Sequence, residues 1–273
     1  MEVIHVNHAD HGIDAKPHVM AVGFFDGVHL GHQELLNHAK ELAKKNNVLF
    51  SVMTFSPHPD EVIKGDNNRK YLSPLPQKIE ELEAMGVDKL FVTEFDKTFA
   101  SIQPADFIQD FIVELNAIHV VVGFDFTFGH KAKGNVQFLQ EATKEYPFSL
   151  SVIPKKTYLG MKISSTLIRE MIQKGKMDLI PYYLGSHYNV SVNLIRSKEK
   201  GRLAVTPSGS NLLPNDGSYY VEITQGKRTI QGEYHQYPGM ENAEITSHLI
   251  NRLDQHCSLK FLSKIESVST VSV

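Results

Sequence analysis

Met20-Ala-Val-Gly-Phe-Phe-Asp-Gly-Val-His-Leu-Gly-His32 is the stretch around which the first half of the chain is organised. The apolar residues from His18 to Phe25 predict a buried parallel strand. Gln33 to Lys45 repeat their apolar side chains at helical spacing, so a helix is expected to begin at Leu30 or Gly31. A strand, a glycine-rich turn and a helix in this order are common in α/β proteins, so the stretch predicts that fold class.

Glycines and histidines occupy the turn itself. Glycine lets the backbone come close to a ligand, and a helix N-terminus offers free N–H groups and a positive dipole end to an anion. His29 and His32 lie three residues apart, so they face the same way on the first helical turn and both can donate to phosphate oxygens. An isolated pair of this kind is more often an ordinary surface or core feature. The flanking strand and helix favour a nucleotide-phosphate site, and the spacing fits neither a zinc metalloprotease nor a P-loop.

The composition bounds the class of protein. The 273 residues suit two domains or one large one, and 41% hydrophobic with 22% charged residues is ordinary for a globular protein with a sizeable core. A net charge of −3 does not indicate binding to nucleic acid or to a membrane surface. The single cysteine, Cys257, excludes an intramolecular disulfide framework and a cysteine-rich zinc site. Without a signal-peptide pattern or an apolar run of about 18 residues, a cytoplasmic protein is expected.

Strands and helices alternate along the chain to about residue 175. Val48 to Phe55 predicts the strand that completes a right-handed βαβ unit with the opening stretch. The pattern further predicts strands at 3–6, 89–94, 119–123 and 148–153, helices at 73–85, 100–115 and 135–145, and a polar, mobile loop at 60–72.

Two segments follow predicted strands at their carboxyl ends, where open parallel sheets bind ligands. Ser56-Pro-His-Pro59 places His58 there, although two prolines also explain a rigid turn. Phe124-Asp-Phe-Thr-Phe-Gly129 alternates aromatic and polar residues, so its rings could stack on a flat ligand or could simply pack. The basic residues that could meet the phosphate of such a ligand are His130, Lys131 and Lys133.

Ile163-Ser-Ser-Thr-Leu-Ile-Arg-Glu-Met-Ile-Gln-Lys-Gly175 predicts another helix, which Ser164 or Ser165 can cap. An ordinary serine-capped amphipathic helix is one interpretation. The other is a second helix N-terminus that binds phosphate, with the Arg169 guanidinium as a fork-shaped donor one turn inside it.

Four motifs resemble those of the prokaryotic riboflavin kinase/FAD synthetase family, whose adenylyltransferase module belongs to the His-x-Gly-His nucleotidyltransferase superfamily. They are Gly-Phe-Phe-Asp-Gly-Val-His-Leu-Gly-His (23–32), Phe-Ser-Pro-His-Pro (55–59), Gly-Phe-Asp-Phe-Thr-Phe-Gly (123–129) and Ile-Ser-Ser-Thr-Leu-Ile-Arg (163–169). The resemblance implies a Rossmann-like α/β domain with a parallel sheet at residues 1–180. It also implies transfer of AMP from ATP to FMN, giving FAD and pyrophosphate, with Mg²⁺ bridging phosphate oxygens.

The resemblance also implies roles for individual residues. The FMN phosphate would attack the α-phosphorus directly, so the site would align the substrates and neutralise charge. The expected catalytic residues are His29, His32, Ser165 and Arg169, with no metal ligand assigned. The residues expected to bind ATP beside them are Gly23, Phe25, Asp26, Gly31, Ser164 and Thr166. Those expected on the flavin side are Pro57, His58, Asp125, Phe126 and Phe128.

The second half predicts a small antiparallel β-barrel at 181–273, after a short linker helix at 180–185. Leu212-Leu-Pro-Asn-Asp-Gly-Ser-Tyr219 resembles a turn of the family's riboflavin kinase barrel. The β-rich segments lie at 188–195, 201–206, 219–224 and 228–234, a last strand and helix are expected at 258–265, and a disordered tail at 267–273.

The kinase chemistry does not carry over to this barrel. Ala204-Val-Thr-Pro-Ser-Gly-Ser-Asn211 stands where the kinase has Gly-Phe-Pro-Thr-Ala-Asn, and the kinase's Asn-x-Gly-x-x-Pro-Thr segment is absent. The family's catalytic glutamate lies two residues before a histidine, and the residue two before His248 is Thr246. The barrel is therefore expected to be a degenerate one that has lost kinase activity.

The leading hypothesis is a monofunctional FMN adenylyltransferase whose partners are ATP and FMN, with no nucleic acid and no membrane. A bifunctional riboflavin kinase/FAD synthetase is the first alternative. A flavin- or nucleotide-binding regulatory protein without catalysis is the second, and the intact His-x-Gly-His and Ser-Ser-Thr-x-Ile-Arg motifs argue against it.

Overall fold

The computed structural model forms two compact units. The first contains Met1–Arg69 and Leu75–Thr157, and the second contains Lys70–Pro74 and Tyr158–Val273. The chain therefore passes between the units three times. The residues that the structure describes are 1–8, 15–196, 201–248 and 255–266, so the tail predicted at 267–273 lies outside them.

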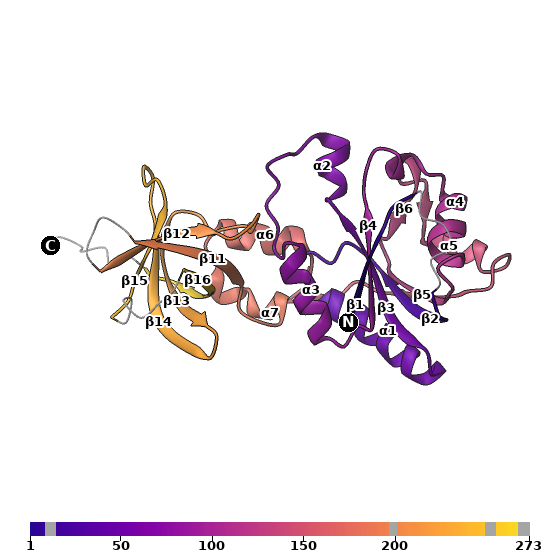
Figure 1. The fold of residues 1–273 in the computed structure, drawn as a ribbon, viewed down its shortest axis with the longest axis horizontal. Coiled ribbons are helices and arrows are strands. Elements are labelled where there is room, and N and C mark those ends of the chain that lie inside the picture. The colour runs from indigo at the N-terminus through magenta and orange to yellow at the C-terminus, as the bar shows by residue number, and fades with distance from the viewer. Residues whose placement is uncertain (9–14, 197–200, 249–254, 267–273) are drawn as a thin grey trace. The chain divides into compact units, whose positions relative to one another are not determined.

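The first unit is built on a parallel sheet (Figure 1). The sheet has six strands in the order β1-β4-β3-β2-β5-β8. All five residues of β2 are buried, as the apolar run predicts. From β2 the chain adds β3 and β4 on one side and then returns to add β5 on the other, so the strand order reverses between β2 and β5. The strands are β1 (Glu2–Val6), β2 (His18–Val22), β3 (Leu49–Ser56), β4 (Lys89–Glu94), β5 (Ala117–Gly123) and β8 (Ser149–Ile153).

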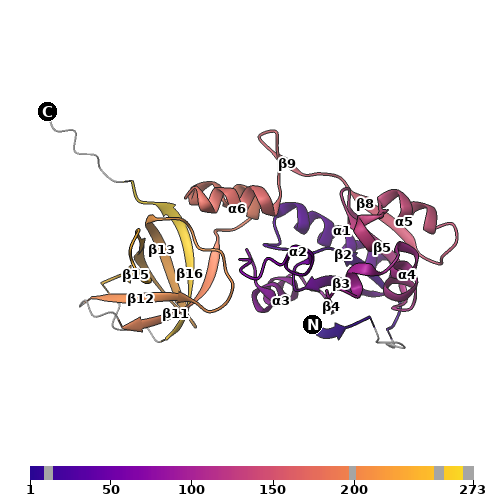
Figure 2. The ribbon, with the colours of Figure 1, turned by 90° about the horizontal axis from the view of Figure 1, so that it is seen from above.

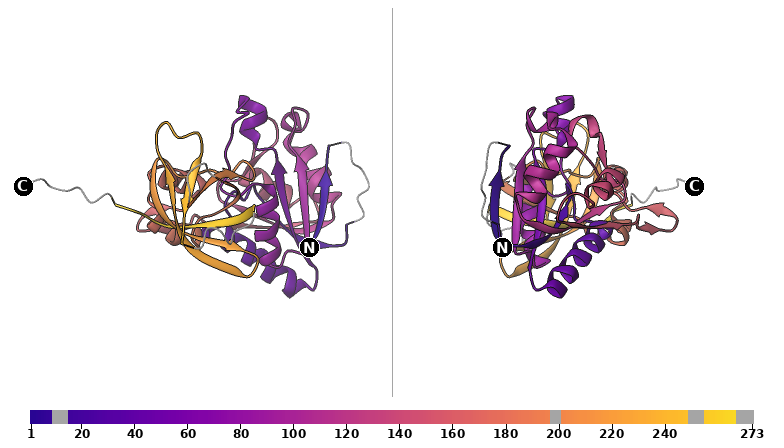
Figure 3. Two further views of the ribbon diagram at one scale, coloured as in Figure 1. Left: turned by 60° about the vertical axis from the view of Figure 1, so that its left-hand side comes forward. Right: turned by 90° about the vertical axis from the view of Figure 1, so that its right-hand side faces the viewer.

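Helices cover both faces of this sheet (Figure 3). Alternate residues of β2 enter two separate cores: Val19 and Ala21 on one face, Met20 and Val22 on the other. The first core is completed by α1 (Leu30–Asn46) and α3 (Leu75–Ala84). The second core is completed by α4 (Pro104–Ile108), the π-helix η2 (Gln109–Val113) and α5 (Val136–Ala142). The predicted Rossmann-like α/β domain with a parallel sheet is confirmed.

Two segments of the first unit differ from the predictions. The stretch predicted as a loop at 60–72 begins with a helix, α2 (Pro59–Lys64), capped at its start by His58 and Glu61. The single helix predicted at 100–115 is broken into η1 (Phe99–Ser101), α4 and η2. Pro104 has no N–H for a preceding helical turn, so a new helix starts there instead of continuing the first. The structure also contains short paired strands, β6 (Thr127–Phe128) with β7 (Gly134–Asn135) and β9 (Thr157–Tyr158) with β10 (Met161–Lys162).

The second unit contains α6 (Ser165–Gln173), η4 (Met177–Leu179), α7 (Pro181–Leu184) and a closed barrel (Figure 2). Every strand pair of the barrel is antiparallel, as predicted. The segment predicted as a strand and helix at 258–265 is one continuous strand, because its side chains alternate between buried and partly exposed. The barrel order is β11 (Asn189–Arg196), β12 (Arg202–Pro207), β15 (Ala243–Thr246), β14 (Arg228–Gln236), β13 (Gly217–Gln225) and β16 (His256–Lys264).

Aromatic rings fill the barrel. Tyr188, Tyr219, Tyr234 and Phe261 are each at most 1% exposed, and the centroid of the Phe261 ring lies 5.1 Å from that of Tyr234 and 5.9 Å from that of Tyr219. The interior is therefore a packed core, in keeping with the size of a small barrel.

The crossing segment, Lys70–Pro74, belongs to the second unit although both of its neighbours in sequence belong to the first. Its Tyr71 forms a parallel bridge with Asn211, next to the predicted kinase-like turn. The Tyr71 N–H donates to the carbonyl of Ser210 at 2.7 Å, and the Leu212 N–H donates to the carbonyl of Tyr71 at 2.8 Å. The segment is thus hydrogen-bonded to the barrel's 210–212 loop.

Candidate phosphate-binding site

The predicted site residues of the first unit come from three neighbouring strands. The opening motif follows β2, Pro57 and His58 follow β3, and Asp125 to Phe128 follow β5. All three strands are parallel, so their carboxyl ends meet at one edge of the sheet. That edge includes the reversal of strand order between β2 and β5, which is where open α/β sheets bind nucleotides.

The turn after β2 is tight. Phe25, Gly27 and Val28 have positive φ angles of 54°, 81° and 35°. A Cβ atom on Gly23 would lie 2.9 Å from the buried ring of Phe25, so this position requires glycine. Asp26 lies in the same turn and is only 4% exposed. The turn therefore places a carboxylate and the start of α1 in a fixed conformation.

His29 is the N-cap of α1, and its side chain has a structural partner. Its Nδ1 accepts a hydrogen bond from the His32 N–H at 3.2 Å. Nδ1 is therefore unprotonated, and the ring proton of neutral His29 resides on Nε2. A Cβ atom on Gly31 would lie 3.3 Å from the His29 ring, so Gly31 leaves room for this histidine in the capping position.

His32 stacks on His29, with ring centroids 3.6 Å apart and an angle of 11° between the rings. Its Nδ1 is buried and has no hydrogen-bond partner among the described residues. The pKa of His32 lies well below its usual value, first because burial disfavours the charged ring and then because His29 and Lys78 add unfavourable charge. A neutral ring with a buried, unpartnered nitrogen is costly to fold and is typical of a binding site.

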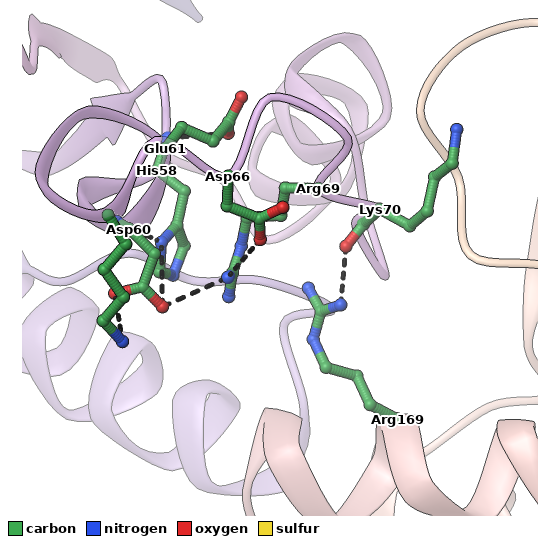
Figure 4. A network of polar contacts seen from close by, with 8 residues as sticks. His58, Asp60, Glu61, Asp66, Arg69, Lys70 and Arg169 are labelled. Atoms are coloured by element: carbon green, nitrogen blue, oxygen red, sulfur yellow. Dashed lines mark hydrogen bonds and ion pairs between the residues drawn. The ribbon is translucent and has the colours of Figure 1, made fainter.

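His58 is held by the backbone of α2. Its Nδ1 accepts from the Asp60 N–H at 3.0 Å, while its own N–H donates to Glu61 Oε1 at 3.2 Å, which together form a capping box (Figure 4). The ring also packs edge-on against Phe24, with centroids 4.3 Å apart. The structure therefore gives His58 a capping role, and its contact with a flavin stays a prediction.

Ion pairs hold the segment that follows His58. The Arg69 Nη1 atom lies 3.2 Å from Asp60 Oδ2 and 3.7 Å from Asp66 Oδ2 (Figure 4). The Lys64 Nζ atom lies 2.9 Å from Asp60 Oδ1. The pKa of the Asp60 carboxyl is lowered, chiefly because Lys64 donates to it. These contacts explain why a stretch rich in polar residues forms defined structure where a mobile loop was predicted.

The aromatic segment after β5 divides into buried and accessible rings. Phe128 is 6% exposed and packs against Phe107, with centroids 5.0 Å apart. Phe126 is partly buried and stacks on Phe128 at 5.6 Å, while Asp125 is exposed and Phe124 is 41% exposed. Phe128 therefore belongs to the core of the sheet, which leaves Phe126 and Phe124 as the rings that a flat ligand can reach.

Phe128→Ala is expected to lower the free energy of unfolding by about 3 kcal/mol, because it opens a cavity among packed rings. Phe124→Ala removes the same kind of ring four residues earlier at an exposed position, and a change within about 0.5 kcal/mol is expected. Urea denaturation followed by circular dichroism measures both. Equal stability of the two variants would contradict the assignment of Phe128 to the core.

Lys78 of α3 also lies at this edge, and it belongs to none of the four sequence motifs. It is 2% exposed, and its Nζ donates to the carbonyl of Phe24 at 2.6 Å. The signal was present: Lys78 falls on the apolar stripe that Leu75, Ile79 and Leu82 form at helical spacing, where a charged residue is out of place.

The Ser-Ser-Thr motif belongs to the second unit. Ser164 is the N-cap of α6, and its Oγ accepts from the Leu167 N–H at 3.3 Å, so one of the two predicted capping residues is confirmed. Ser165 and Thr166 form the first turn. One turn further, Arg169 donates from its guanidinium to the carbonyl of Lys70 in the crossing segment at 2.5 Å (Figure 4).

Among the described residues, no group of three or more His, Cys, Asp or Glu side chains is placed to hold a metal ion. None of the helices in those residues is long and apolar enough to span a membrane.

Comparison with known proteins identifies the family. The family model described as FAD synthetase matches residues 12–167. A bifunctional riboflavin kinase/FMN adenylyltransferase of Bacillus subtilis (strain 168) is 36% identical over 81% of this chain and 73% of the relative. An FAD synthetase of Listeria monocytogenes is 34% identical over 81% of this chain and 87% of the relative.

The fold also has a counterpart among solved structures. A crystal structure described as a macrolide-efflux protein from Streptococcus pneumoniae matches with a TM-score of 0.88, covering 100% of this chain and 94% of that one at 23% identity. At that identity the likeness shows the fold alone. The family model and the relatives show more, and the chain belongs to the FAD synthetase family of FMN adenylyltransferase enzymes.

Proposed function

We propose that this protein transfers AMP from ATP to FMN, forming FAD and pyrophosphate, and that it does not phosphorylate riboflavin. The observation that carries the transferase activity is the stacked pair His29 and His32 at the start of α1. The pair lies at the carboxyl edge of the sheet beside the reversal of strand order, where an anion also meets the N-terminus of a 17-residue helix.

The chemistry needs alignment and charge neutralisation. An oxygen of the FMN phosphate bonds to the α-phosphorus of ATP while the bond to the bridging oxygen breaks, and pyrophosphate leaves with that electron pair. His29 and His32 donate to the phosphate oxygens on which charge develops. Mg²⁺ enters as part of the MgATP substrate and neutralises phosphate charge there.

The other predicted residues are proposed to contact the two substrates. Gly23, Phe25, Asp26 and Gly31 form the turn that faces the adenosine, and Pro57, His58, Asp125 and Phe126 lie on the flavin side. Ser164, Ser165, Thr166 and Arg169 bind the β- and γ-phosphates at the start of α6. With these roles, the transferase module extends to about residue 180 and includes α6.

The barrel is proposed to lack kinase activity. Thr246 occupies the position of the kinase's glutamate, and its Oγ1 lies 3.2 Å from His235 Nε2, so the side chain there is a hydroxyl engaged with a neighbouring strand. The packed aromatic interior supports a structural role for residues 181–273. The bifunctional names of several relatives, including that of Bacillus subtilis, make loss of the kinase the part of the proposal that most needs testing.

One assay tests both halves of the proposal. The purified protein is incubated with MgATP and either FMN or riboflavin, and the flavins are separated by chromatography. FAD is expected from FMN, with pyrophosphate in equal amount, and no FMN is expected from riboflavin. Formation of FMN from riboflavin would remove the claim about the barrel, and bound FMN without turnover would favour a regulatory protein.

The substrates and the composition of the chain also suggest where the enzyme acts. The substrates are small molecules, and we expect the enzyme to act in the cytoplasm without nucleic-acid or membrane partners. Its one cysteine, Cys257, is a free, buried thiol, which fits a reducing compartment.

A further inference from the structure

Lys78 is a buried cation whose ammonium group contacts Phe24 of the opening motif. Its ammonium group lies 2.6 Å from the carbonyl oxygen of Phe24, 3.3 Å from Thr54 Oγ1 and 4.0 Å from the centroid of the Phe24 ring. Thr54 Oγ1 donates to the same Phe24 carbonyl at 2.9 Å. Two donors, one charged and one neutral, therefore hold the peptide at which the chain leaves β2 and enters the turn that carries Asp26 and His29.

Folding alone does not account for a lysine here. Burying an ammonium costs far more than burying a methionine of similar length, and Thr54 already satisfies the Phe24 carbonyl. Burial lowers the pKa of Lys78 to about 8, while Asp26 and then Glu81 act to raise it. Since that pKa is above 7, the ammonium remains predominantly charged at neutral pH.

The charge of Lys78 acts on His32. Lys78 is one of the groups that lower the pKa of His32, after burial and His29. The acidic groups that act on Lys78 in turn are Asp26 and Glu81, so they offset part of its charge. Lys78 therefore adds positive potential at His32, at the sheet edge where phosphates are expected.

We propose that Lys78 is a positioning residue of the phosphate site, which holds the Phe24 turn and keeps a fixed positive charge behind His32. The inference rests on the proposed AMP transfer for its kinetic consequence. A buried cation in a medium of low dielectric constant stabilises charge that develops on the leaving pyrophosphate, without a cost of reorganisation at the moment of reaction. The same charge disfavours protonation of His32, so this ring stays a neutral donor and acceptor.

Lys78→Gln is the test, because glutamine removes the charge and retains an N–H donor. The expected kcat for FAD formation is about 100-fold lower, with the KM for MgATP changed less than about threefold, since the charge acts mainly in the transition state. In the ligand-free protein, the titration midpoint of the His32 ring, followed by NMR of labelled histidine, is expected to shift upward.

Three further variants separate the effect of the Lys78 charge from the effect of backbone support. Lys40→Gln changes another lysine that donates to a backbone carbonyl, that of Met85 at 2.7 Å, and it is expected to alter neither kcat nor the His32 midpoint. Thr54→Val removes the neutral donor to Phe24, and a loss of less than about tenfold in kcat is expected. Lys78→Arg keeps the charge and should retain more activity than Lys78→Gln.

The results distinguish an effect of the Lys78 charge from an effect of backbone support alone. An unchanged His32 midpoint in Lys78→Gln, or an equal loss of kcat in Thr54→Val, would overturn the role of the charge. Should Lys78→Gln not fold, the comparison of Lys78→Arg with Thr54→Val decides instead. If the charge is what matters, Lys78→Arg is the more active of these two variants; if it is not, Lys78→Arg is no more active than Thr54→Val. Should the wild-type protein form no FAD, the proposed function falls, and the NMR titration still decides whether Lys78 controls His32.

Discussion

His32→Ala is expected to lower the rate of FAD formation about 1,000-fold and to leave the fold intact. Loss of one preorganised donor to developing charge commonly costs a factor of about 100 to 1,000. The upper end is expected here because the ring also packs against His29, whose position it supports. The His32 Nδ1 has no hydrogen-bond partner among the described residues, so its removal leaves no protein group there unsatisfied. Initial rates with MgATP and FMN measure the effect, and a thermal melt checks the fold.

His38→Ala is the matched control, because it removes the same ring from the same helix further along α1. The control is expected to keep its rate within about twofold of the wild-type protein, as for a substitution away from the site. A normal rate in His32→Ala would remove His32 from the mechanism. A loss of similar size in His38→Ala would point to a general effect on α1.

Phe261→Ala is expected to unfold the barrel at physiological temperature. The side chain is fully buried and touches the rings of Tyr188, Tyr219 and Tyr234, so truncation leaves a large cavity at the centre of a small core. Substitutions of this kind cost about 4 kcal/mol, a large fraction of the stability of a small unit. Calorimetry of the full chain is expected to show a much lower transition temperature for the second unit.

Tyr220→Ala serves as the control for this prediction. Tyr220 is an aromatic residue on β13 with 48% exposure, and its truncation is expected to cost less than about 1 kcal/mol. If both variants melt alike, the aromatic interior does not determine the stability of the barrel. If Phe261→Ala also lowers FAD formation, the Arg169 and Tyr71 contacts within the second unit give the reason.

The sequence was sufficient for most of the architecture because the parallel sheet has a strong signal. Strands buried on both faces must be apolar along their length, and β2 and β3 are read directly from such runs. The broken helix at 99–113 was missed because its apolar stripe continues across the breaks, as the buried Phe107 and Phe111 show. Periodicity reports which face is buried, and it does not report where the backbone hydrogen bonds change.

The sequence predicted which residues lie at the carboxyl edge of the sheet better than it predicted what each side chain contacts. The turn after β2 and the start of α1 follow from the glycines and histidines of the opening motif, because a buried strand precedes them and an amphipathic helix follows. His58 and Phe128 show what the letters leave out: the sequence did not predict that His58 also caps α2 or that the Phe128 ring is packed in the core. For Lys78, the helical pattern marks a charged residue on an apolar stripe, but its contact with the Phe24 carbonyl depends on the closeness of α3 to the end of β2, which is a tertiary fact.

The route of the chain between its two units has a consequence for how the protein can be divided. Covalent connections exist at 69–70, 74–75 and 157–158, so the second unit holds a short piece of polypeptide whose two ends both lead back to the first. Cleavage by a protease at Thr157 would leave the halves tethered through Lys70–Pro74. A gene split at the same point would yield an amino-terminal fragment that still carries this segment, so the two products would have to find each other by inserting it rather than by simple docking.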